Sequence, residues 1–178
     1  MNVPILLSWR EVVPLKPQSL VVLDIDETFL WFPTITEEWW KDLVYTLRLT
    51  HGIESAHRLA REEWRRVVSI ELPKQTDQDG FKELNDAIRD TKSKLIFLTA
   101  RSESIAPLTR KHLTDCGVSA DVEVHFSCNK GETLRAIAAR NPENKEIVCV
   151  DDKMSNLYDV LYHNPNAKVY LWIDPKTA

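Results

Sequence analysis

Four short runs of apolar residues, rich in β-branched side chains and each cut off by polar residues, stand out along the chain. They are SLVVLDID (19–26), KLIFLTA (94–100), EIVCVDD (146–152) and AKVYLWID (167–174), with a weaker run, DVEVHFS, at 121–127. Runs of this length that are apolar at successive positions are typical of strands buried on both faces of a sheet. The sequence therefore predicts a set of buried strands.

Helical patterns separate these runs. Apolar residues recur at helical spacing over 105–116, with Gly117 placed to end the helix, and over 134–138, with Pro142 beyond it. A third helix is predicted within 154–162. Strands that alternate with helices of this length indicate βαβ units. We predict an α/β three-layer sandwich built on a mainly parallel, Rossmann-like sheet.

The stretch from about Thr34 to Val68 breaks this alternation, because it has no strand pattern and carries two helical stripes. Trp40 lies on the first stripe and Trp64 on the second. We expect an αα-hairpin above the carboxyl end of the first strand, returning through a linker at 72–80. The predicted organisation is an α/β core, residues 1–33 and 80–178, and a helical cap insertion, residues 34–79.

Polar side chains follow each predicted strand where it ends. In chain order they are Asp24, Asp26 and Thr28; Thr99 and Arg101; Lys130; and Asp151, Asp152 and Asn156. In an open parallel sheet, ligands bind outside the carboxyl ends of the strands. We therefore expect these side chains to meet at one edge of the sheet and form a site.

The residue types in this set suit phosphoryl transfer. Asp24 and Asp26 are two apart, so on an extended backbone they project to the same side. Clustered carboxylates raise one another's pKa, and a hard cation such as Mg²⁺ relieves the repulsion. Lys130 adds a fixed positive charge, and the Thr99 hydroxyl can donate to a phosphate oxygen. Together they supply what transfer through an aspartyl-phosphate requires.

The motifs DIDET, FLTAR, the lysine of NKGE, and VDDKMSN resemble, in order, the four sequence motifs of the haloacid dehalogenase (HAD) superfamily. The resemblance covers residues 19–174 but not the residue identities of the insertion, which sits where this superfamily carries its first kind of cap. Within the superfamily the chain looks most like small bacterial phosphatases with DIDET-type motifs. The resemblance implies a HAD core fold and a Mg²⁺ cofactor.

The resemblance also implies roles for the first motif. Asp24 would be the nucleophile and a Mg²⁺ ligand. Asp26 would be the general acid and base, with its backbone carbonyl on the metal. Thr28 would help to position Asp26. An Asp at the position of Asp26 fits phosphatases and phosphomutases, and fits dehalogenases poorly.

The other motifs would complete the site. By resemblance, Thr99 and Lys130 bind the phosphoryl oxygens, Asp152 holds Mg²⁺ with the help of Asp151, and Asn156 orients the metal ligands from behind. Motif four ends in Asn156 rather than an acid, which leaves this site one negative charge short of the family pattern.

Two further side chains are candidates for contact with substrate. Arg101 is either a substrate contact or a structural residue. Trp39 lies off its helical stripe and is the better candidate for a ring that faces substrate, whereas Trp40 and Trp64 are expected to pack inside the cap.

Composition narrows the class of protein. A formal charge of −4 argues against a nucleic-acid or anionic-membrane binder, and no apolar stretch is long enough to cross a bilayer. Residues 1–18 contain three prolines; they predict an irregular arm and lack the basic start of a secretory signal. The three cysteines show no zinc-site spacing. We predict a cytoplasmic protein, with export by a non-Sec route left open.

The leading hypothesis is a Mg²⁺-dependent phosphomonoester hydrolase that acts through an aspartyl-phosphate on a small phosphorylated metabolite. A non-catalytic protein of the same fold and a phosphotransferase remain alternatives. A receiver-type signalling domain uses similar residues, but there the lysine comes last, whereas Lys130 precedes the second acidic pair. The substrate and the oligomeric state stay open.

Overall fold

The computed structural model describes residues 3–174, and its centre is a six-stranded sheet in the order β1-β8-β7-β2-β5-β6, every adjacent pair parallel. The strands are β1 (Ile5–Leu6), β2 (Ser19–Leu23), β5 (Lys94–Thr99), β6 (Glu123–Phe126), β7 (Glu146–Asp151) and β8 (Lys168–Trp172). The five predicted strands are all present. Residues 1, 2 and 175–178, assigned above to the core, lie outside the described residues.

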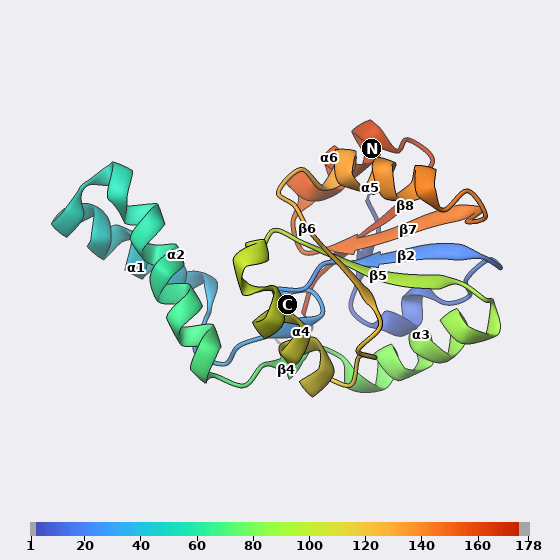
Figure 1. Cartoon of the computed structure of the whole chain (residues 1–178), viewed down its shortest axis with the longest axis horizontal. Helices are drawn as coiled ribbons and strands as arrows, with labels where there is room; N and C mark the ends of the chain where they lie inside the picture. The colour runs from blue at the N-terminus through green and yellow to red at the C-terminus, as the bar shows by residue number, and fades with distance from the viewer. Residues whose placement is uncertain (1–2, 175–178) are drawn as a thin grey trace.

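Helices cover both faces of this sheet, which gives three layers (Figure 1). They are α3 (Gln78–Asp90) and α4 (Ala106–Asp115) on one face, and α5 (Lys130–Arg140) and α6 (Met154–His163) on the other. Successive residues of β2 point to opposite faces, so Val21 joins the cluster beneath α3 and Val22 the cluster beneath α5 and α6. This explains the unbroken apolar runs. The predicted α/β three-layer fold is confirmed.

The N-terminal segment is more ordered than its prolines suggested. β1 forms the edge of the sheet and pairs with β8, and the 3₁₀ helix η1 (Trp9–Val12) follows it. The Trp9 ring is fully buried and stacks on Trp172, with ring centroids 4.2 Å apart. The predicted irregular arm is therefore wrong: a two-residue strand is too short to show a period, and burial of one indole fixes the segment.

The insertion forms a helical hairpin that projects from one end of the molecule (Figure 1). It consists of α1 (Glu37–His51) and α2 (Ile53–Ile70), placed between two short antiparallel strands, β3 (Leu30–Trp31) and β4 (Lys74–Gln75). The Thr36 hydroxyl caps α1 by accepting a hydrogen bond from the backbone N–H of Trp39 at 3.0 Å. Gly52, at a φ of +79°, makes the sharp turn between the helices.

The base of the hairpin is tied to the core. Val68 near the end of α2 is fully buried, and Trp39 and Trp64 pack, partly buried, against the core cluster beneath α3. Trp39, predicted to face substrate, thus turns toward the core, because α1 meets the core at its first turn. Within residues 3–174, no helix has the length and apolarity to cross a membrane.

Candidate active site

The strand order brings the predicted site residues to one edge of the sheet. β2 lies between β5 and β7, so the chain changes direction across the sheet beside β2, where open α/β folds bind ligands. Asp24 follows the last residue of β2, Thr99 ends β5, Asp151 ends β7 with Asp152 next, and Lys130 opens α5. The structure therefore gathers residues that are more than 120 positions apart in sequence.

Lys130 is the positive centre of this cluster. Its ammonium donates to Asp24 Oδ1 at 2.5 Å and to Asp151 Oδ2 at 2.6 Å, and its side chain is only 3% exposed. Burial alone would lower the pKa of Lys130, but the ion pairs with Asp24 and Asp151 outweigh it and raise the pKa above its ordinary value. Lys130 is thus held as a charged group between two carboxylates.

Three carboxylates form a group that could hold a metal. Asp24, Asp151 and Asp152 each offer an oxygen within 4.8 Å of the others. Burial raises the pKa of Asp24 to about 7 against the attraction of Lys130, and the two neighbouring acids add to the rise. Burial likewise raises the pKa of Asp152 to about 6. One ammonium does not balance three acids, so the oxygen donors fit a hard divalent cation such as Mg²⁺.

Asp26, also predicted as a metal ligand, lies outside that group. Its carboxylate pairs with Arg101, whose Nε and Nη2 donate to its two oxygens at 2.8 and 2.6 Å. Only its backbone carbonyl, the ligand atom that the resemblance implies, would be left for a metal.

Arg101 was a candidate substrate contact, and the structure gives its guanidinium different partners. The side chain is 1% exposed, and beyond Asp26 its Nη1 lies 3.3 Å from Thr109 Oγ1 and 3.2 Å from His112 Nδ1. A buried guanidinium engaged in this way is placed to hold protein groups rather than a ligand in solvent.

Thr28 and Asn156 support the carboxylate group. The Thr28 hydroxyl accepts from the backbone N–H of Asp152 at 2.9 Å and lies 3.4 Å from both Asp24 Oδ2 and Asp152 Oδ1. The resemblance implied that Thr28 positions Asp26, whereas its hydrogen bonds here go to Asp24 and Asp152. The Asn156 amide donates to both oxygens of Asp151 at 2.9 and 3.0 Å.

Thr99 is fully buried at the end of β5. Its hydroxyl oxygen accepts from the backbone N–H of Arg101 at 3.2 Å. A hydroxyl that accepts one hydrogen bond keeps its own proton for donation. Thr99 can therefore still donate to a phosphoryl oxygen, as the resemblance implies.

Sequence reasoning missed the side chains behind Arg101. Phe32 and Trp64 lie at its guanidinium, with centroid distances of 5.9 and 5.5 Å, and His112 also hydrogen-bonds the backbone of Val68 in α2. His112 was assigned to a helical stripe, and its polar partners could not be inferred from that spacing. The sequence signal that could have pointed to these partners was a histidine on an otherwise apolar helical stripe.

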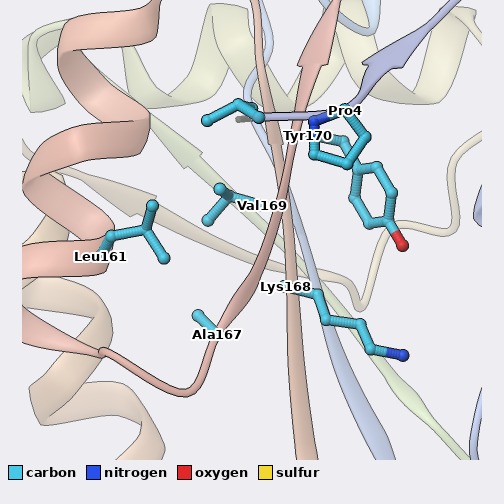
Figure 2. Close-up of a pocket in the computed structure, with 7 residues that line it drawn as sticks. Pro4, Leu161, Ala167, Lys168, Val169 and Tyr170 are labelled. Carbon is cyan, nitrogen blue, oxygen red and sulfur yellow. The ribbon is translucent and has the colours of Figure 1, made fainter. Parts of the chain in front are cut away.

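A hollow of about 350 Å³ lies away from this cluster, beside β8. Figure 2 shows Leu161, Ala167 and Val169 on one side of β8, with Lys168 and Tyr170 directed to the other. Its lining offers no converging carboxylates, so we place the site at Asp24 instead.

No protein-family model and no curated protein sequence matches the chain. A solved structure, the class C acid phosphatase from Bacillus anthracis, is similar in shape, with a TM-score of 0.52 and 13% identity over 91% of this chain and 69% of that one. The two chains share one fold. The same enzyme with tungstate bound gives a TM-score of 0.48 at 14% identity, over the same shares of each chain.

This likeness agrees with the α/β fold that the four motifs implied, and that fold is confirmed. At 13% identity the likeness concerns the fold. The side chains at the end of β2 indicate the reaction.

Proposed function

We propose that the chain is a Mg²⁺-dependent phosphomonoester hydrolase that acts through an aspartyl-phosphate on Asp24. The observation that carries this proposal is the position of Asp24, buried at the end of the central strand, paired with Lys130 and grouped with Asp151 and Asp152. The shared fold with an acid phosphatase supports it.

Asp24, Asp152 and the backbone carbonyl of Asp26 would hold the metal, with Asp151 assisting. Bound there, Mg²⁺ would neutralise phosphate charge and relieve the repulsion among the acids. Lys130 and Thr99 would bind the phosphoryl oxygens, and Lys130 would favour the ionised form of Asp24 against the effect of burial. Thr28 and Asn156 fix the carboxylates so that little reorganisation is needed when substrate arrives.

The covalent steps fall to Asp24 and Asp26. An oxygen of Asp24 attacks phosphorus, the bond from phosphorus to the ester oxygen breaks, and Asp26 gives a proton to the leaving alcohol. Asp26 then takes a proton from water, whose oxygen attacks phosphorus and releases Asp24 and inorganic phosphate. The insertion, residues 34–79, would act as the cap that restricts the site to small phosphorylated substrates.

The test is hydrolysis of p-nitrophenyl phosphate with Mg²⁺ or with EDTA. We expect metal-dependent turnover that falls about a thousandfold or more in Asp24→Asn, because the nucleophile is removed. Asp90→Asn, an exposed acid at the end of α3, is the matched control and should keep wild-type turnover. Equal rates with EDTA, or an active Asp24→Asn variant, would contradict the mechanism.

A further inference from the structure

Asp26 and Arg101 form a fork-to-fork ion pair, with two parallel hydrogen bonds of 2.8 and 2.6 Å. This geometry fixes both the distance and the plane of the Asp26 carboxylate, which a single bond to a lysine would not do. The Asp26 side chain is 31% exposed, so it reaches the solvent side of the site while Arg101 holds it from within.

The far side of the Arg101 guanidinium is held by two elements. From α4, Thr109 Oγ1 lies 3.3 Å and His112 Nδ1 3.2 Å from its Nη1. From the hairpin, the Trp64 ring lies against the guanidinium with its centroid 5.5 Å away, within the range of a cation–π contact. The hairpin thus touches the network that ends at Asp26.

A second contact ties the same network to the hairpin. The His112 ring hydrogen-bonds the backbone of Val68, one helical turn beyond Trp64 in α2, and Val68 is fully buried. Movement of α2 would therefore disturb Trp64 and His112 together. Both contact Arg101, and Arg101 pairs with Asp26.

We propose that Arg101 is a positioning residue that aims the Asp26 carboxylate for proton transfer, and that α2 of the hairpin holds Arg101 in place through Trp64 and His112. Docking of the hairpin and the geometry of the acid–base group are then coupled. This inference rests on the proposed function, because it needs Asp26, protonated on an oxygen lone pair that the Arg101 fork leaves free, to give that proton to a leaving group.

Leaving-group dependence separates this role from substrate binding. p-Nitrophenolate leaves without much help from an acid, whereas phenolate needs the proton, so we measure kcat/KM for p-nitrophenyl phosphate and for phenyl phosphate. Arg101→Lys keeps the charge and loses the fork. We expect it to lower kcat/KM about tenfold or more further for phenyl phosphate than for the nitro ester, within the range of general acid catalysis.

Trp64→Leu should change the same ratio in the same direction by a smaller factor, and Trp64→Phe should restore it. The Trp64 variants also test the inference if Arg101→Lys does not fold. Arg110→Lys, exposed on α4, and Trp40→Leu, on α1, are the matched controls and should leave the ratio at the wild-type value. Equal losses on both esters would mean that Arg101 binds substrate, and would overturn the inference.

A thermal-unfolding double-mutant cycle of Arg101→Lys and Trp64→Leu gives a readout apart from activity. We expect the two changes to be non-additive, and additive effects would overturn the coupling. A wild-type protein that hydrolyses neither ester would overturn the proposed function, and the role of Arg101 in catalysis with it. Active wild type with an unchanged ratio in both variants overturns only the present inference.

Discussion

Asp24 occupies a position that costs the metal-free protein stability. The carboxylate is buried at the end of β2, where the nearby Asp151 and Asp152 oppose its charge and Lys130 favours it. Burial raises its pKa to about 7, so near neutral pH the protonated form of this acid is substantially populated in the folded chain. Such strain is common where function, rather than stability, selects the residue.

Asp24→Asn should therefore stabilise the metal-free protein. The folded pKa of about 7 lies above the ordinary value of 3.8, so the contribution of Asp24 to stability is fully present below about pH 4 and is lost as pH rises toward 7. We expect the variant's advantage in free energy of unfolding to grow over this window to about 2 kcal/mol or more. Urea unfolding in EDTA at pH 5 and pH 8 measures it.

Magnesium gives the matching control. Because Asp24 is a proposed ligand, Mg²⁺ should raise the melting temperature of the wild type more than that of Asp24→Asn. An Asn variant less stable than wild type at pH 8 in EDTA, or an equal shift with Mg²⁺ in both, would contradict this account of the carboxylate cluster.

His112 should give stability the opposite pH dependence. Burial and the Arg101 guanidinium lower its pKa to about 4, against weaker opposition from Asp26, while Lys111 adds to the lowering. A folded pKa below the ordinary 6.5 means that its contribution is present above pH 6.5 and is lost as pH falls toward 4. We expect the stability advantage of wild type over His112→Gln to shrink across that window, measured by urea unfolding at pH 7.5 and 5. The exposed His51→Gln is the control, and an advantage that grew on acidification would contradict the assignment.

At the level of elements, α5 and α6 meet at Gly131, next to Lys130. The Gly131 N–H donates to Asp159 Oδ2 at 2.7 Å, and a Cβ placed on Gly131 would lie 2.1 Å from the Asp159 carbonyl oxygen. The missing side chain lets α6 approach α5, which holds Lys130 in register with Asp24. The close packing of α6 on α5 therefore requires a glycine at this position.

Gly131→Ala should thus destabilise the protein, although alanine favours helix by about 1 kcal/mol. We expect a loss of about 2 kcal/mol or more from overpacking against backbone, and a fall in turnover as Lys130 shifts. Gly52→Ala is the comparison: it has open space, but its φ of +79° and ψ of 166° lie in a region that almost only glycine adopts, so it should cost about 1–3 kcal/mol and leave turnover unchanged. Chemical unfolding and p-nitrophenyl phosphate assays of both variants decide this, and equal effects on turnover would refute the role of Gly131.

The elements also show which features can be read from sequence. The ends of β2, β5 and β7 were predictable because buried strands leave continuous apolar runs, and polar residues after them mark a ligand edge. The partners of Arg101 were not, because Asp26 lies 75 positions away and His112 looked like one more residue of an apolar stripe. Side-chain pairing across elements depends on the packed fold and leaves no period in the sequence.

At the level of the whole molecule, the hairpin is attached at a narrow base. β3 and β4 pair beneath it, and the Thr34 N–H donates to Glu71 Oε1 at 3.0 Å, which brings the two ends of the insertion together. The sheet and its four covering helices form their own core clusters, to which the hairpin adds Val68 and, partly buried, Trp39, Trp64 and Val67. A cap joined in this way can affect substrate selectivity although the core does not need it in order to fold.

Replacing residues 36–70 by a short Gly-Ser linker should leave the core folded, because Thr34 and Glu71 already lie in contact. We expect a lower melting temperature from the loss of Val68, and about a tenfold or greater fall in the preference for p-nitrophenyl phosphate over a bulky phosphotyrosine peptide, since the site would be open to larger esters. Leu49→Ser, exposed near the hairpin turn, is the control and should keep the wild-type preference. Equal loss of kcat/KM on both substrates would show that the hairpin supports the site without selecting what enters it.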